Sequence, residues 1–178
     1  MMSRISYLKS GLVLLLIISG LAAAYFFRGE IISRLIEMRT GEGAPLPNFS
    51  FMRMDSIYIT EAALERNREI MVMYFNPGCD DCIAAVDSLR QNAGLLDGIQ
   101  LLLVSPAPAT VLVMFYKFYK LSSLKDLAIC HDQEDTFYGI FGANSFPTFY
   151  LYSSEWNLQN KIAGDSAIFE VMKVLRNK

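Results

Sequence analysis

The segment Phe75-Asn76-Pro77-Gly78-Cys79-Asp80-Asp81-Cys82 joins a buried strand to a helix and carries two cysteines three positions apart. Residues Glu69–Phe75 form an apolar run of strand length, and Asn76-Pro77-Gly78 ends that run. We expect a helix to begin at Cys79. Positions i and i+3 of a helix share one face, so the sulfurs of Cys79 and Cys82 can meet across the first turn. The segment therefore predicts a redox-active cysteine pair at the start of a helix.

The two cysteines are expected to have different roles. Cys79 lies at the helix N-terminus, where unpaired N–H groups and the helix dipole stabilise a thiolate. Cys82 lies one turn further in and is better shielded, which suits a two-step exchange in which Cys79 attacks a disulfide and Cys82 resolves the mixed disulfide. A Cys-x-x-Cys pair can also be half of a zinc site, a purely structural disulfide or a vestigial pair. The strand and proline before it and the helix after it favour the redox interpretation.

Outward from this segment, the sequence alternates between strand and helix patterns. The expected strands are Asn48–Met52, Ser56–Thr60, Ile99–Val104, Leu127–Cys130, Thr148–Tyr152 and Leu158–Ala163, and the expected helices are Glu61–Arg68, Thr110–Lys120, Glu134–Phe141 and Ser166–Arg176. Strands separated by helices imply a parallel core, and a hairpin near the end adds an antiparallel edge. The pattern therefore predicts an α/β fold with a mixed central sheet.

The N-terminal region predicts a membrane segment. Residues Gly11–Phe27 include no charged side chain, and Tyr7–Phe27 approaches the roughly 20 apolar residues that a membrane-spanning helix needs. A cleaved signal peptide is the alternative, with Leu12–Leu21 as its apolar part and Ala22-Ala23-Ala24 as its cleavage site. The aromatic residues Tyr25–Phe27 continue the run like an interfacial belt, which favours an uncleaved signal anchor. Either reading sends the rest of the chain out of the cytoplasm, where disulfides persist.

Composition divides the chain into residues 1–43, an anchor and linker, and residues 44–178, one folded domain. Thr40–Pro47 is rich in Gly and Pro and poor in core-forming residues, as expected of a linker. Residues 1–40 carry five basic and two acidic side chains, whereas the remainder carries eleven basic and sixteen acidic ones. An acidic domain without a Lys/Arg cluster argues against nucleic-acid binding.

The segment around the cysteines resembles the active-site segment of the thioredoxin superfamily. It is most similar to the membrane-anchored bacterial thiol–disulfide oxidoreductases of the redoxin and peroxiredoxin-like branch. Ala44-Pro45-Leu46-Pro47-Asn48-Phe49 resembles the lead-in of that branch, and Ser145-Phe146-Pro147-Thr148 resembles its cis-proline loop. The resemblance implies a thioredoxin-like three-layer α/β/α domain over residues 44–178, preceded by one N-terminal transmembrane helix. It also implies thiol–disulfide exchange without a cofactor or a metal.

The resemblance assigns roles to further residues and implies partners. In that family the cis-proline packs beside the two sulfurs, and the residue before it pairs with the substrate backbone; here these are Pro147 and Phe146. Pro77, Asp80 and Asp81 flank the reactive pair. The implied substrates are disulfides of exported proteins, and the implied electron donor lies in the membrane or the periplasm. The implied location is the inner (cytoplasmic) membrane, crossed once, with the domain on the periplasmic side.

The sequence departs from the thioredoxin pattern at three places. Phe75 stands where many thioredoxins have Trp, and Asp80-Asp81 replaces a small or cationic pair. Two carboxylates beside Cys79 disfavour its thiolate, so we expect a reducing rather than a strongly oxidising couple. Met73 occupies the position of the buried acid of thioredoxins, so no obvious proton acceptor for Cys82 is predicted.

Two other residues and a second class of function need to be considered. Cys130 is expected to be a buried small hydrophobic residue. His131 is the only histidine, and because adjacent strand residues point to opposite faces, Cys130 and His131 are poorly placed to share a zinc ion. The alternative function is a redox-silent or copper-binding (Sco-like) thioredoxin-fold module at the membrane. Sco-like proteins have three residues between their cysteines, and this chain has two.

Overall fold

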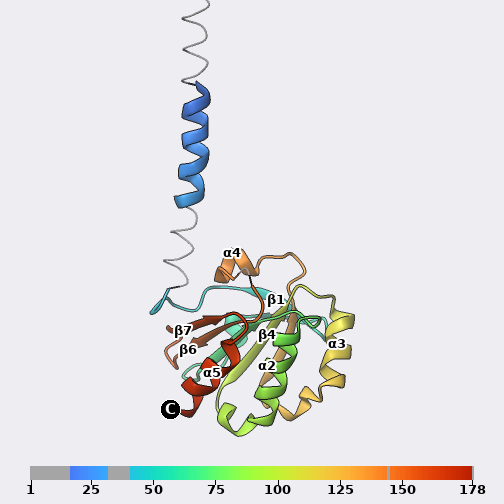
Figure 1. Cartoon of the computed structure of the whole chain (residues 1–178). Coiled ribbons are helices and arrows are strands. Elements are labelled where there is room, and N and C mark those ends of the chain that lie inside the picture. Colours follow the sequence, from blue (N-terminus) through green and yellow to red (C-terminus); the bar gives the residue numbers. More distant parts are fainter. Residues whose placement is uncertain (1–16, 32–40, 144, 178) are drawn as a thin grey trace, which may run out of the picture. The chain divides into compact units, whose positions relative to one another are not determined.

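The computed structural model describes residues 17–31, 41–143 and 145–177, which belong to two units, Met1–Met38 and Arg39–Lys178. In the first unit, residues 17–31 form a helix, coloured blue in Figure 1. Within the part of the chain that the structure describes, no helix is both long and apolar enough to cross a membrane. Residues 7–16 of the predicted anchor lie outside the described residues. The anchor therefore remains a prediction.

The second unit is built on a seven-stranded mixed sheet with the strand order β2-β1-β5-β4-β3-β6-β7. Its strands are β1 (Ser50–Arg53), β2 (Tyr58–Thr60), β3 (Ile70–Tyr74), β4 (Gln100–Ser105), β5 (Leu127–His131), β6 (Thr148–Tyr152) and β7 (Leu158–Ala163). Strands β3, β4 and β5 run parallel. The pairs β3–β6, β6–β7, β1–β5 and β1–β2 are antiparallel. The predicted parallel core with an antiparallel edge is confirmed.

Helices cover both faces of this sheet. They are α2 (Asp80–Gln91), α3 (Ala109–Phe118), α4 (Phe137–Phe141) and α5 (Ala167–Arg176), with short 3-10 turns η1 (Glu61–Ala63), η2 (Ala93–Leu96) and η3 (Leu121–Ser123). Residues from α2, α3 and α5 share one core cluster with Met71 and Met73 of β3. Residues from α4 and β1 share a second cluster with Val72 and Tyr74. Alternate residues of a strand point to opposite faces, so the two clusters lie on opposite faces of the sheet. Each fills the space between the sheet and the helices that cover that face, which gives the three layers seen in Figure 1.

The predicted helix Glu61–Arg68 is wrong: only the short turn η1 forms there. The Gln100 side chain explains why the helix does not continue. Its Oε1 accepts from the Glu65 N–H at 2.6 Å, and its Nε2 donates to the Glu65 carbonyl at 2.9 Å. Asn67 also adopts a left-handed conformation, with φ 62°. The backbone groups of Glu65 are therefore satisfied by a residue 35 positions away rather than by a helix.

The end of the Gly/Pro-rich segment, where the predicted domain begins, is hydrogen-bonded to the start of β7 and the turn before it. Gly43 N donates to Leu158 O at 2.7 Å, and Leu46 N donates to Trp156 O at 2.8 Å. Ala44 and Leu46 are buried. This part of the Gly/Pro-rich segment is held along the start of β7 because its backbone groups find partners there.

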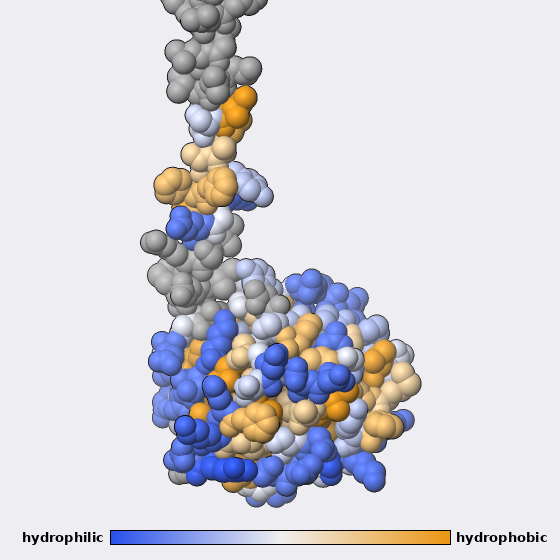
Figure 2. All heavy atoms as spheres, in the orientation of Figure 1, coloured by the Kyte–Doolittle hydropathy of each residue, from blue (hydrophilic) through white to orange (hydrophobic). Residues whose placement is uncertain are grey.

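Helix α3 is less buried than its aromatic content suggests. Phe115 faces the core, whereas Met114 and Phe118 are 63% and 77% exposed. Figure 2 shows hydrophobic surface in the region of α3 among mostly hydrophilic side chains. One side of α3 therefore faces the core, and Phe118 lies outside that side.

Candidate active site

The candidate site lies where the three parallel strands end. Tyr74, Ser105 and His131 are the last residues of β3, β4 and β5. The carboxyl ends of parallel strands meet at one edge of a sheet, which is where open α/β sheets bind their ligands. Helix α2 also begins at this edge, directly after Cys79.

A tight turn and a helix cap hold Cys79 in place. The Asn76 side-chain oxygen accepts from Gly78 N at 2.9 Å, and the Asn76 carbonyl accepts from Cys79 N at 3.1 Å. Cys79 is the N-cap of α2, and its sulfur accepts from Cys82 N at 3.3 Å. The sulfur thus occupies the place that a Ser or Asp oxygen has in an ordinary cap. Developing negative charge on this sulfur is stabilised by an N–H group and the helix dipole.

Cys82 lies one turn further along α2 and is fully buried, whereas Cys79 is partly exposed. Burial raises the pKa of the Cys82 thiol to about 12, because its thiolate would lose contact with water. A hydrogen bond with the Asn76 backbone opposes this shift, and the Cys79 thiol and the Asp81 charge add to it. The Cys79 sulfur lies 3.3 Å from the backbone N of Cys82, so the two cysteines adjoin each other, and only Cys79 is open to an incoming disulfide.

Alkylation of the reduced chain tests this difference between the cysteines. At pH 8 a thiol with a pKa near 12 is ionised only to about one part in ten thousand. The pKa of Cys130 is also raised to about 12 by burial. We expect iodoacetamide to modify one cysteine, Cys79, in the native protein and all three after denaturation, as read by peptide mass spectrometry. Equal labelling rates at Cys79 and Cys82 would contradict the site geometry.

The loop before β6 lies next to the end of β3, because Tyr74 pairs with Thr148. The peptide bond between Phe146 and Pro147 is cis, and Pro147 is buried while Phe146 is partly exposed. The Pro147 carbonyl accepts from Gly164 N at 3.1 Å. Phe146 and Cys79 both pack against the core cluster that contains Cys82. The fold thus brings this loop to the end of β3, where the turn that leads to Cys79 begins.

The other predicted site residues surround this pair. Asp80 is exposed and Asp81 is half-buried in the first turn of α2, and Pro77 is half-buried in the turn before it. Met73 is fully buried in the same core cluster as Cys82. The carboxylate whose charge acts on Cys82 is that of Asp81 rather than that of a buried acid on β3.

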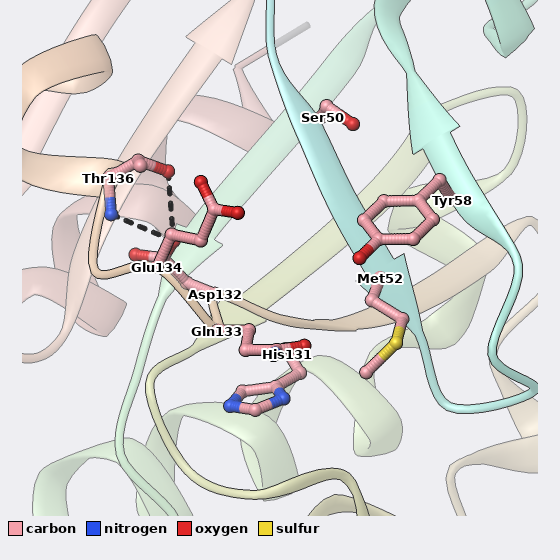
Figure 3. A pocket seen from close by; sticks show the side chains of 8 residues that line it. All are labelled: Ser50, Met52, Tyr58, His131, Asp132, Gln133, Glu134 and Thr136. Atoms are coloured by element: carbon pink, nitrogen blue, oxygen red, sulfur yellow. Dashed lines mark hydrogen bonds between the residues drawn. The ribbon is translucent and has the colours of Figure 1, made fainter.

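Cys130 and His131 lie apart from the pair. Cys130 is fully buried, as expected, in the cluster on the α4 side of the sheet, opposite the cluster of Cys82. His131 lines a small cavity of about 90 Å³ together with Ser50, Met52, Tyr58, Asp132, Gln133, Glu134 and Thr136. Figure 3 shows the His131 imidazole and the Glu134 carboxylate pointing away from each other. Among the described residues, no three His, Cys, Asp or Glu side chains are grouped to hold a metal ion.

Two residues at this edge escaped the sequence analysis. Tyr74 ends β3 and its ring packs at a tilt against that of Phe146, with ring centroids 4.7 Å apart. Asp132 is buried and binds the start of α4 through its carboxylate. One signal in the sequence could have identified Asp132, which is an acidic residue directly after a buried strand and shortly before a helix. Nothing local distinguishes Tyr74 from the rest of an apolar strand.

Comparison with known proteins supports the fold. No protein-family model and no curated protein sequence matches the chain. Its structure is similar to that of a secreted disulfide oxidoreductase from Mycobacterium tuberculosis, with 16% identity, a TM-score of 0.61 and coverage of 73% of this chain and 96% of that one. A thiol:disulfide interchange protein of the thioredoxin family from Chlorobium tepidum is 16% identical, with a TM-score of 0.60 over 75% of this chain and 94% of that one. A thiol-disulfide oxidoreductase from Bacteroides fragilis is 17% identical, with a TM-score of 0.57 over 73% and 98%.

Proposed function

We propose that this chain, whose fold is that of the thioredoxins, catalyses thiol–disulfide exchange through Cys79 and Cys82. The observation that carries the proposal is the cysteine pair itself. A partly exposed sulfur caps α2 and accepts the Cys82 N–H at 3.3 Å, and the buried Cys82 thiol lies in the first turn of the same helix. An accessible nucleophile next to a shielded resolving thiol suits the two steps of this reaction.

In the first step, the Cys79 thiolate attacks one sulfur of a substrate disulfide. A bond forms between that sulfur and Cys79, the substrate S–S bond breaks, and the other substrate sulfur leaves as a thiolate that takes up a proton. In the second step, the Cys82 thiol loses its proton and attacks the Cys79 sulfur. The Cys79–Cys82 disulfide forms, the second substrate thiol leaves, and two electrons have passed to the substrate. A dithiol donor then returns the pair to its reduced form by the reverse exchange.

Exported proteins are the substrates that we propose. The similar structures include a secreted disulfide oxidoreductase, and disulfides form and persist outside the cytoplasm. The apolar N-terminal segment supports a location at the inner membrane, with residues 44–178 on the periplasmic side and a membrane or periplasmic protein as electron donor. An extended substrate segment would pair with the backbone of Phe146 like an added strand.

The direct test is reduction of a protein disulfide by the purified whole chain. Insulin serves as substrate with dithiothreitol as the source of electrons, and precipitation of the freed chains reports the rate. We expect turnover above the rate of dithiothreitol alone, and the variants that lack one cysteine identify the residues responsible. A chain that forms no mixed disulfide and gives no acceleration would exclude the proposed function.

The direction of exchange depends on the acidic pair in the first turn of α2. Asp80 and Asp81 place negative charge next to a sulfur that must become negative, so they favour the oxidised pair. We expect the Asp80→Asn/Asp81→Asn variant to be more oxidising, with a reduction potential raised by on the order of 10–30 mV. Equilibration with glutathione or dithiothreitol buffers measures the potential. The Asp87→Asn variant, which changes a carboxylate that pairs with Arg90 further along α2, serves as the control and is expected to shift it less.

A further inference from the structure

Three aromatic rings form a stack beneath the loop that precedes β6. The Tyr74 ring lies parallel to that of Phe137, with centroids 4.1 Å apart and an interplanar angle of 1°. The Tyr74 ring also contacts the ring of Phe146, with centroids 4.7 Å apart and an interplanar angle of 41°. Such pairs stabilise a structure beyond the effect of the area they bury. We call Phe137, Tyr74 and Phe146 the aromatic stack.

The lower two rings of the aromatic stack are firmly held. Phe137 is fully buried, stacks on Phe141 with centroids 4.5 Å apart, and donates its backbone N–H to Asp132 at 2.9 Å. Tyr74 lies in β3 between two paired strands, with Val104 of β4 and Thr148 of β6 as its partners. These contacts give the aromatic stack a rigid base.

The third ring belongs to the predicted substrate-binding loop. Tyr74 lies opposite Thr148, the residue after Pro147, and its ring contacts Phe146, the residue before Pro147. Tyr74 therefore touches the loop on both sides of the proline. Among the described residues, no hydrogen bond is found to the backbone N–H or C=O of Phe146, so these groups are available to a peptide. The Phe146 side chain contacts Tyr74, and this contact fixes the direction of the Phe146 backbone N–H and C=O.

Tyr74 acts through packing rather than through charge. Burial raises its pKa to about 12, and the carboxylates of Asp132 and Asp135 add to the shift. Its phenol therefore stays neutral over the pH range in which thiols exchange. A neutral ring fixed between two others is suited to holding a backbone in place.

We propose that Tyr74 is a positioning residue for the exchange reaction, which holds the Phe146 backbone ready to pair with an extended peptide beside Cys79. This inference rests on the proposed function. The inference adds to that function a preferred substrate, which is an extended segment of a protein or peptide rather than a small disulfide. A substrate that pairs with the Phe146 backbone binds more tightly when the loop is already held in place. A small aromatic disulfide that reaches only the Cys79 sulfur does not bind more tightly when the loop is held in place.

The test compares two substrates of the reduced whole chain in single-turnover kinetics. One is a disulfide-bonded peptide with an extended flank, and the other is 5,5′-dithiobis(2-nitrobenzoate). We expect Tyr74→Leu to raise the concentration for half-maximal rate with the peptide about five- to tenfold, the size of one aromatic contact. The limiting rate and the rate with the small disulfide are expected to stay within twofold of wild type. Tyr74→Phe keeps the ring and is expected to restore peptide use.

Two further variants separate positioning from stability. Phe115→Leu removes a buried ring that contacts Phe75 on the other face of the sheet. This variant is expected to lower the free energy of unfolding without changing the ratio of the rates measured with the two substrates. Phe146→Leu is expected to mimic Tyr74→Leu, and the double variant is expected to be no worse than either. Phe146 is partly exposed, so this variant tests the stack even where Tyr74→Leu does not fold.

The outcomes distinguish the inference from the function on which it rests. A wild-type chain that reacts with neither disulfide refutes the proposed function. A wild-type chain that reacts with both, together with a Tyr74→Leu variant that slows both equally or neither, refutes the positioning role. Additive effects of Tyr74→Leu and Phe146→Leu also refute it, because Tyr74 would then not act through Phe146.

Discussion

Replacing Cys79 by serine is expected to abolish reduction of a protein disulfide, with a loss on the order of a thousandfold or more. A serine hydroxyl is not ionised at neutral pH and cannot attack a disulfide sulfur, although it can still cap α2. The variant should therefore fold like the wild type, because the contact from Cys82 N to the side chain at position 79 remains possible. Insulin reduction measures the loss, and chemical denaturation verifies that the free energy of unfolding is retained.

Replacing Cys82 by serine is expected to give a different defect. Cys79 can still attack, but the resolving thiol is missing, so the mixed disulfide accumulates as a covalent one-to-one complex. Non-reducing electrophoresis and mass spectrometry detect this complex, and dithiothreitol releases it. Cys130→Ser is the matched control, because Cys130 is buried on the other face of the sheet, and we expect it to exchange at the wild-type rate. Trapping at Cys130, or no trapping in Cys82→Ser, would contradict the assigned roles.

Local patterns were sufficient to predict most of the fold. The buried run before Asn76-Pro77-Gly78 became β3, and the cysteine pair lies at the start of α2. Strands β6 and β7 begin and end where the sequence predicted. Each of these elements is bounded by its own turn residues or by a change of periodicity, and that information lies within a few residues of the boundary.

The misjudged elements depend on distant partners. Residues 61–68 lost their predicted helix because Gln100 binds both backbone groups of Glu65. The backbone partners of the Gly/Pro-rich segment are also distant in the sequence, since Gly43 and Leu46 donate to Leu158 and Trp156. The aromatic stack is a third case, since Tyr74, Phe137 and Phe146 meet only once the sheet has formed. A single sequence contains the cysteine pair as a local motif, but not the side chains that contact the loop before β6.

Asp132→Ala is expected to cause the largest loss of stability among single substitutions at the edge of the sheet that bears the cysteines. Asp132 is 3% exposed, and its carboxylate accepts three hydrogen bonds. Thr136 donates from its N–H at 2.9 Å and from its hydroxyl at 3.0 Å, and Phe137 donates from its N–H at 2.9 Å. The two Thr136 bonds are the dashed lines in Figure 3. Alanine would leave these donors without a partner.

The expected cost is about 2–4 kcal/mol in the free energy of unfolding, because hydrogen bonds to a charged group contribute about 1.5–3 kcal/mol and unpaired buried donors are costly. Thr136→Ala removes one of the three bonds and should cost about 1 kcal/mol. Urea denaturation with an unchanged m-value measures both. Asp135→Asn is the control, because residue 135 is exposed and has φ 51°, a conformation that asparagine tolerates.

The Asp132 variant also links stability to the aromatic stack. Asp132 holds the N–H of Phe137, and Phe137 supports Tyr74 beneath the loop at Phe146. Freeing the start of α4 should therefore weaken use of an extended peptide substrate more than use of a small disulfide, in the same sense as Tyr74→Leu. A variant that loses 2 kcal/mol or more but keeps the wild-type ratio between the two substrates would show that α4 stabilises the domain without steering the loop. An unchanged free energy of unfolding would mean that the three donors find other partners, and the cap that we assign to Asp132 would then be wrong.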